Sequence, residues 1–179
     1  MPEFFQTTKP SFDLLGEGGW RQPQLGALGA VLRHWSLARP EPTLISIPTG
    51  TGKTAIALAS PFLASETPRR VLVLAPAQQV RRQLADQFAS YAQLIRLGVL
   101  PDTLAVPSVY EMTGRATDWA ALERYDVVVA RPNSISSVHY EEGMLPPSEL
   151  FDLYRVRDLD GRAGQRTPLA MLRARQHRS

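Results

Sequence analysis

The chain has 179 residues, enough for one α/β domain with a substantial core and too short for two full-sized domains. It contains no cysteine and only three histidines, which excludes a disulfide framework or a thiolate metal site and gives no reason to expect a structural zinc ion. The formal net charge is +3, but seven arginines against two aspartates give residues 153–179 a charge of +5 and leave −2 for residues 1–152. The basic character therefore belongs to the last part of the sequence.

The first residues carry no signal for export. Residues 1–6 lack a charged stretch followed by an apolar one, and no run approaches the roughly 18 apolar residues of a membrane-spanning helix. We therefore expect a soluble cytoplasmic protein with no membrane partner. Residues 1–19 end in a glycine-rich stretch and are expected to be a flexible lead-in.

The first predicted helix follows this lead-in and opens at residues 20–24. Apolar residues recur on one side of it at helical spacing: Leu25, Leu28, Val31, Leu32 and Trp35. Pro40 and Pro42 end the segment. Trp20 and Trp35 are expected to pack in the core rather than to stack against bases.

The most informative segment comes next and reads Ile45-Ser46-Ile47-Pro48-Thr49-Gly50-Thr51-Gly52-Lys53-Thr54. Its apolar start predicts a strand, and its glycines let backbone N–H groups approach phosphate oxygens. Lys53 supplies a charge for the β- and γ-phosphates, and the Thr54 hydroxyl suits Mg²⁺. Residues 54–59 predict a helix whose positive dipole end faces the anion. The alternative is a loop that only caps this helix.

Strands and helices alternate after this loop. Residues 71–74 and 126–130 are continuous apolar runs, typical of strands buried on both faces. The other predicted elements are a long amphipathic helix over residues 78–97, a short strand over 104–109, a short helix over 119–125 and a helix or turn from residue 133. This order predicts an α/β fold with a parallel sheet covered by helices on both sides.

The arrangement resembles the first motor domain of superfamily 2 helicases, particularly the DEAD/DEAH-like proteins whose N-terminal domain is shared with type III restriction subunits. The resemblance covers residues 15–152, and Pro48 to Thr54 has the form typical of nucleic-acid helicases. Ile47 stands where the general pattern G-x-x-x-x-G-K-[ST] has glycine. The resemblance implies a three-layer, RecA-like P-loop domain that uses ATP and Mg²⁺ to move along or unwind nucleic acid, with DNA favoured over RNA.

The resemblance also implies roles for residues outside the loop. Arg21 and Gln24 fall where such helicases read the adenine edge, the glutamine by its amide and the arginine as a support. Together with Pro48, Thr49, Gly50, Thr51, Gly52, Lys53 and Thr54, they form the predicted ATP site, with Thr54 as the Mg²⁺ ligand.

A second set of residues is predicted to contact the nucleic-acid backbone. Pro76, Arg81, Arg82 and Gln83 lie in a segment that resembles motif Ia, a strand end and helix start that lies against that backbone. A solvated helix face is the alternative for the two arginines. Arg131 stands where many members have the threonine of a Thr-Pro turn, and arginine can also contact phosphate.

ATP hydrolysis also needs an aspartate that holds Mg²⁺ and a residue that orients the attacking water. In the resembling family both lie in an acidic box that follows an apolar strand, and residues 145–153 resemble the approach to that strand. The chain then reads Tyr154-Arg155-Val156-Arg157, and two unpaired arginines in a central strand would cost several kcal/mol. Asp158 and Asp160 are weak candidates for the missing acids, because two aspartates beside a glycine more often make a turn.

We therefore expect residues 20–152 to be a partial helicase-type ATP-binding domain, truncated before motif II and without the second motor domain. Arginine outnumbers lysine eighteen to two, as in GC-rich coding sequence, so residues 153–179 are interpreted as an out-of-frame basic tail. An authentic basic helix over residues 168–176 is the alternative. ATP binding is the activity expected to remain, and whether the chain is an enzyme stays open. A nucleotide-binding module without hydrolysis and a different small P-loop NTPase are the other hypotheses, and the sequence identifies no partner subunit.

Overall fold

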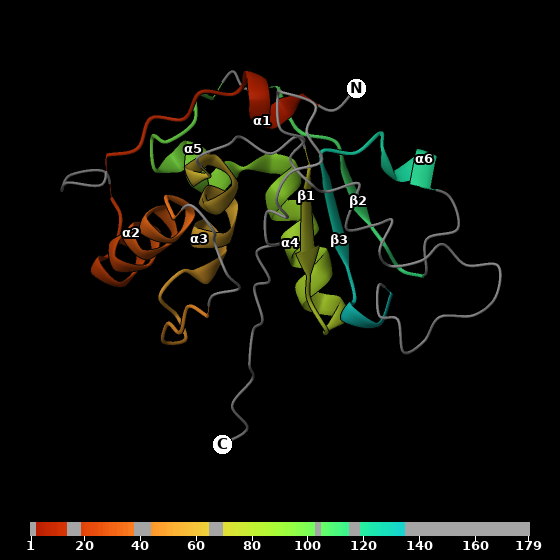
Figure 1. The fold of residues 1–179 in the computed structure, drawn as a ribbon, viewed down its shortest axis with the longest axis horizontal. Coiled ribbons are helices and arrows are strands. Elements are labelled where there is room, and N and C mark those ends of the chain that lie inside the picture. Colours follow the sequence, from red (N-terminus) through yellow and green to blue (C-terminus); the bar gives the residue numbers. More distant parts are fainter. Residues whose placement is uncertain are drawn as a thin grey trace.

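The computed structural model describes residues 3–13, 19–37, 44–64, 70–102, 105–114 and 119–134. Figure 1 shows three strands with helices beside and across them. The helical elements are α1 (Phe4–Thr7), α2 (Gln22–Trp35), α3 (Lys53–Ala59), η1 (Ser60–Leu63), α4 (Gln78–Ser90), α5 (Ala92–Arg96), α6 (Trp119–Leu122) and η2 (Pro132–Ser134). The strands are β1 (Val71–Leu74), β2 (Val109–Glu111) and β3 (Val127–Ala130). Within these described ranges, no helix is long and apolar enough to cross a membrane.

The sheet has the strand order β1-β3-β2, and both pairs are parallel. Val127 lies opposite Val71 on one side and Val109 on the other. Because β3 is the central strand, all four of its residues are fully buried, which explains its continuous apolar run. The predicted α/β class with a parallel sheet is confirmed.

The core lies between the sheet and the helices α2 to α5. Val73, Val127 and Val129 point to the same face of the sheet and share a cluster with Phe88 of α4 and Leu28 of α2. Trp20 and Trp35 are partly buried against this cluster, as predicted. The apolar stripe of α2 therefore packs one helix against the centre of the domain.

Two predicted elements are wrong. The helix expected over residues 78–97 breaks at Tyr91, which has a left-handed φ of 49° and separates α4 from α5. The Tyr91 ring is completely buried between aromatic neighbours, and this packing offsets the cost of the unusual backbone. The expected strand at Ile45–Ile47 does not form: both isoleucines pack against the core, but Leu44 beside them is 81% exposed.

The short second strand begins at Val109, where the prediction ended it. The shift places Tyr110 and Glu111 in the sheet, opposite Val128 and Val129 of β3. The expected helices near residues 119–125 and 133 are present as α6 and η2. The approach to motif II at 145–153, the aspartates at 158 and 160 and the basic tail lie outside the described residues.

Part of the N-terminal segment, within residues 3–13, packs on the domain. Residues 4–7 form α1, and Phe4 and Phe5 are 7% and 1% exposed. The Phe4 amide donates a 3.1 Å hydrogen bond to Asp126 Oδ1, and the Ser11 amide donates one of 2.8 Å to the Val99 carbonyl. Two adjacent phenylalanines bury enough apolar surface to hold a helix this short.

Candidate nucleotide-binding site

The predicted phosphate loop folds as a compact turn that leads into α3. Gly50 and Gly52 have φ values of 81° and 84°, the left-handed region that glycine adopts without strain. The Thr51 hydroxyl donates a 2.7 Å hydrogen bond to the Pro48 carbonyl, which closes the turn. Lys53 is exposed at the first position of α3, and Thr54 follows half-buried. The loop therefore presents its lysine and its backbone to solvent.

The two loop glycines differ in what surrounds them. A Cβ at Gly52 would collide with the side-chain nitrogen Nε2 of Gln24. A Cβ at Gly50 would meet no atom within 4 Å, so only its backbone conformation requires glycine there. Gly52 is thus needed for close packing beneath the loop, whereas Gly50 leaves the open side of the turn free for a ligand.

Arg21 and Gln24, at the start of α2, donate hydrogen bonds to the backbone of the phosphate loop. The Arg21 guanidinium donates from Nη1 to the Gly50 carbonyl at 2.9 Å, and Gln24 Nε2 donates to the Gly52 carbonyl at 3.2 Å. Gln24 Oε1 accepts a 2.8 Å hydrogen bond from the Arg21 amide, and only 4% of Gln24 is exposed. The structure therefore brings the predicted adenine-reading pair into direct contact with the phosphate loop.

The loop fits a nucleotide phosphate in two respects. A Cβ-free backbone at Gly50 faces open space, and the Lys53 ammonium stands exposed beside it. Thr54 is placed next to that lysine, where its hydroxyl could ligate Mg²⁺. Among the described residues, no group of three or more acidic or histidine side chains could hold a metal ion.

The two adjacent arginines of α4 have different environments. Arg81 is only 4% exposed, and its Nη1 donates to the carbonyls of Pro76 at 2.9 Å and Ala75 at 3.4 Å. Arg82 is exposed, together with Gln83. Arg81 therefore fixes the turn after β1, and Arg82 is the arginine of this pair that faces solvent.

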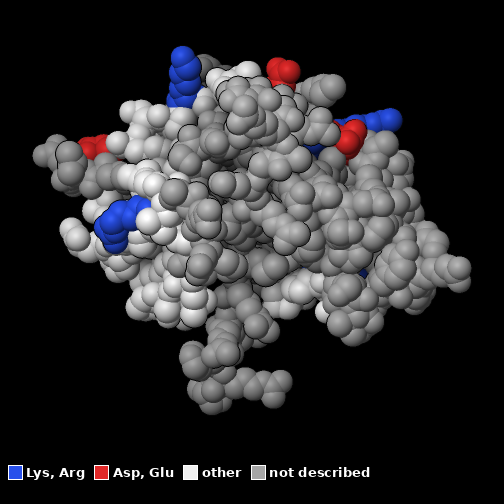
Figure 2. Space-filling model, in the orientation of Figure 1, with Lys and Arg blue, Asp and Glu red and all other residues white. Residues whose placement is uncertain are grey.

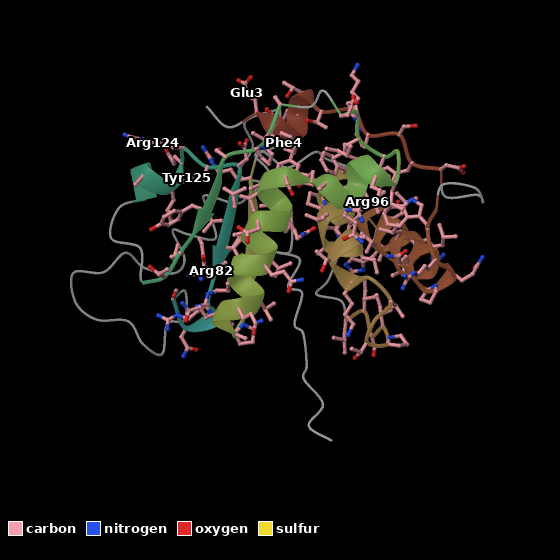
Figure 3. All side chains as sticks on the ribbon, turned by 180° about the vertical axis from the view of Figure 1, so that it is seen from behind. Glu3, Phe4, Arg82, Arg96, Arg124 and Tyr125 are labelled. Carbon is pink, nitrogen blue, oxygen red and sulfur yellow. The ribbon has the colours of Figure 1, made fainter. Side chains whose placement is uncertain are left out.

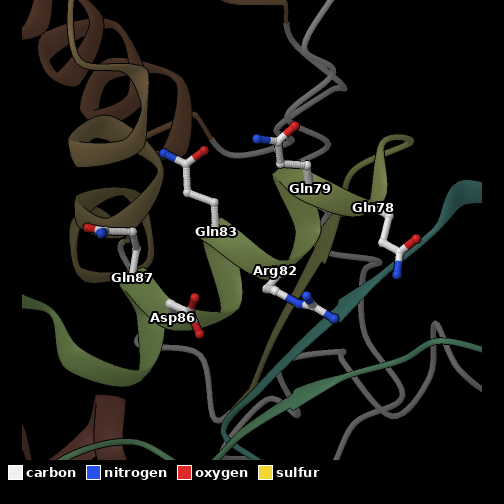
Figure 4. A pocket seen from close by; sticks show the side chains of 6 residues that line it. All are labelled: Gln78, Gln79, Arg82, Gln83, Asp86 and Gln87. Carbon is white, nitrogen blue, oxygen red and sulfur yellow. The ribbon is translucent and has the colours of Figure 1, made fainter.

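Arg82 belongs to a polar face along α4, which lines an open hollow. Figure 4 shows Gln79, Gln83 and Gln87 in a row along the helix, with Arg82 and Asp86 on the adjacent row. Figure 3 places Arg82 toward one end of the sheet and Phe4 toward the other. The face thus combines one cation, one carboxylate and several amides.

Arg131 lies directly after β3 and is exposed. Its Nη2 donates a 3.0 Å hydrogen bond to the carbonyl of Thr113, just beyond β2. Arg131 and the turn at Pro76 thus follow neighbouring parallel strands at the carboxyl edge of the sheet. In Figure 1 the phosphate loop lies toward this same end of the molecule. Figure 2 shows the described basic and acidic side chains of one face as scattered points.

The spacing of α4 contained a signal that distinguishes its arginines. Arg81 is in line with Leu84, Ala85 and Phe88 at helical intervals, which places it on the buried stripe. No comparable pattern marks Asp126 as a structural residue, because its hydrogen-bond partners Phe4 and Ser108 are distant from it in the sequence.

Comparison with known protein families identifies the domain. The family described as type III restriction enzyme, res subunit, matches residues 17–146, which are 130 of the 179 residues. The chain belongs to this family. Its matched region is a helicase-like N-terminal motor domain, and the parallel α/β fold is consistent with a RecA-like P-loop domain of that family. A search of curated proteins found no match.

Proposed function

We propose that this chain binds Mg²⁺-ATP as the N-terminal motor domain of a DEAD/DEAH-like, superfamily 2 protein that moves along or unwinds DNA. The observation that carries the proposal is the braced phosphate loop: the carbonyls of Gly50 and Gly52 are held by Arg21 and Gln24, while Lys53 remains exposed. Bracing fixes the loop conformation before the ligand arrives, which lowers the entropic cost of binding.

In this proposal Lys53 contacts the β- and γ-phosphates, and the backbone from Thr49 to Gly52 surrounds them. Thr54 holds Mg²⁺, which would neutralise phosphate charge. Gln24 reads the adenine edge, and Arg21 supports it while holding the loop. Each polar atom of the Gln24 amide has bonding capacity beyond its present hydrogen bond, but only 4% of Gln24 is exposed, so reading a base requires this side chain to shift.

Nucleic acid is proposed to lie along the carboxyl edge of the sheet. Arg82, Gln83 and Arg131 are exposed there, and Pro76 is exposed in the turn that Arg81 holds. Contacts of this kind neutralise phosphates without reading bases, so binding should weaken as salt rises. DNA is proposed over RNA, and a cytoplasmic location is proposed as well.

We also propose that this chain alone does not turn over ATP, so that its domain at 20–152 acts as a binding unit. The support comes from the sequence, because residues 154–166 do not contain an apolar strand followed by an acidic pair. Phosphate release by the purified chain, stimulated by DNA, would contradict this. Such a result would direct attention to Asp158 and Asp160 as the metal-binding acids.

Calorimetric titration of the full chain with Mg²⁺-ATP tests the proposal. We expect saturable binding that Lys53→Ala abolishes, because that change removes the charge facing the phosphates. Lys9→Ala is the matched control, since Lys9 is exposed and lies on the N-terminal segment, outside the loop. Absence of binding by the unaltered chain, or equal binding by the two variants, would refute the assignment of the loop.

A further inference from the structure

We propose that α1 and the residues beside it, Glu3–Thr8, form an N-terminal clamp whose docking is coupled to nucleotide binding at the phosphate loop. The inference rests on the proposed ATP site. The clamp lies outside residues 17–146, the part that matches the family, and yet it completes the core. The matched motor domain therefore packs against residues that the family match does not include.

The clamp holds three parts of the domain together. Phe4 stacks on Tyr91 at 5.3 Å between ring centroids, and Phe5 packs against Phe62 at 5.3 Å. Tyr91 is the joint between α4 and α5, and Phe62 belongs to η1. The Phe4 amide is bonded to Asp126, which also accepts from the amide and hydroxyl of Ser108 and precedes β3. Helices and sheet thus meet at one small element.

A rigid connection runs from this contact to the phosphate loop. α3 begins at Lys53 and continues without a break into η1, which carries Phe62. At standard rises per residue, these two elements span about 18 Å. Residues 55–59 are all at most 7% exposed, so the segment is packed on every side and transmits displacement rather than absorbing it.

A second connection runs through α5. Gln93 follows Tyr91 by two residues, and its Nε2 would lie 4.0 Å from a Cβ built on Gly52. The ring on which Phe4 stacks is thus close in sequence to a side chain beside the loop. The two rings that the clamp contacts, Phe62 and Tyr91, are thus each connected to the phosphate loop, the first through α3 and the second through α5.

The clamp is suited to opening and closing because docking is what stabilises it. α1 has four residues and no side-chain cap, and a helix this short does not persist in water alone. Its opening can be observed at the amides of Gln6, Thr7 and Thr8, which bond to carbonyls within the clamp. If ATP orders the loop and α3, it favours the docked clamp, and by reciprocity the docked clamp favours ATP.

Hydrogen exchange on the full chain, with and without Mg²⁺-ATP, tests the coupling. We expect exchange of the clamp amides to slow roughly tenfold with ATP, a typical coupling strength, and not to change in Lys53→Ala. Phe5→Leu, which stays apolar but loses the ring contacts with Phe4 and Phe62, should weaken ATP binding several-fold. Leu37→Ala, at a side chain 56% exposed and outside the clamp, should not.

The outcomes separate the two proposals. If ATP binds by calorimetry and slows exchange at the loop but leaves the clamp amides unchanged, the clamp is a structural addition and the coupling is refuted. If calorimetry detects no ATP binding, the proposed function fails, and the coupling fails with it. Slower clamp exchange that persists in Lys53→Ala would also overturn the coupling, since it would not arise from the loop.

Discussion

Replacing Tyr91 by phenylalanine should stabilise the protein, although the ring is at the centre of the aromatic cluster. The Tyr91 hydroxyl is buried and has no hydrogen-bond partner among the residues that the structure describes. A buried polar group without a partner costs about 1–3 kcal/mol, and Tyr91→Phe removes the group while keeping the ring contacts with Phe4 and Phe88. We expect the free energy of unfolding to rise by about 1 kcal/mol and Tm by about 3 °C at neutral pH.

The same hydroxyl makes stability depend on alkaline pH. Burial, and in second place the negative charge of Asp126, raises the pKa of Tyr91 well above its usual value of 10.0. The folded protein therefore keeps a proton that the unfolded chain loses, so this contribution is intact below about pH 10 and declines as pH rises further. Near pH 11 the loss is about 1 kcal/mol, and the advantage of Tyr91→Phe should grow to about 2 kcal/mol.

Urea unfolding of both proteins at neutral pH and near pH 11 measures these differences. Ionisation of the other tyrosines is common to both proteins and cancels in the comparison. A variant less stable than the original protein at neutral pH would mean that the hydroxyl has a bonding partner. A stability difference that stays constant from neutral pH to pH 11 would show that Tyr91 titrates normally.

Two further pairs of substitutions test the loop and the helix beside it. Gly52→Ala should destabilise the fold by about 2 kcal/mol and weaken ATP binding, because the added Cβ collides with Gln24. Gly50→Ala should cost only about 1 kcal/mol, from backbone strain alone. Thermal unfolding of both variants with and without ATP measures these differences. Arg82→Ala should leave the unfolding midpoint unchanged and reduce the salt slope of DNA binding by about one, while Arg81→Ala should lower stability by about 2 kcal/mol. Fluorescence anisotropy with a labelled oligonucleotide at several salt concentrations measures the DNA binding, and urea unfolding measures the stability. Equal DNA binding and equal stability of the two variants would contradict this prediction.

The parts of the fold that could be predicted from sequence are those in which one local pattern determines both element and burial. The apolar run at Val127–Ala130 could only be a buried strand, and it is the central one. The helix break at Tyr91 could not be predicted, because the apolar spacing continues through it and distant rings hold the left-handed backbone. The burial of Phe4 has the same origin: its partner Asp126 is 122 residues away.

The phosphate loop was predictable for a different reason, since glycine positions and a lysine are a local signature of the chemistry. Its strand was not, because pairing depends on which neighbours the sheet provides. Ile45 and Ile47 have the alternation of a strand and are partly buried against the core, as that pattern requires, yet they join no ladder. The apolar character of this segment thus predicted its packing correctly and its hydrogen bonding wrongly.

Gln24 shows why adenine recognition and loop conformation are not independent properties of this domain. Its Nε2 donates to the Gly52 carbonyl and its Oε1 accepts from the Arg21 amide, so both polar atoms already take part in holding the loop. A substitution that removes base recognition at this position also removes support from beneath the glycine. Loss of ATP affinity in a Gln24 variant therefore has two sources, and only a nucleotide with a different base separates them. If loss of the hydrogen bond to the Gly52 carbonyl is the larger source, the affinities for GTP and ATP fall together. If loss of base reading is the larger source, only the affinity for ATP falls.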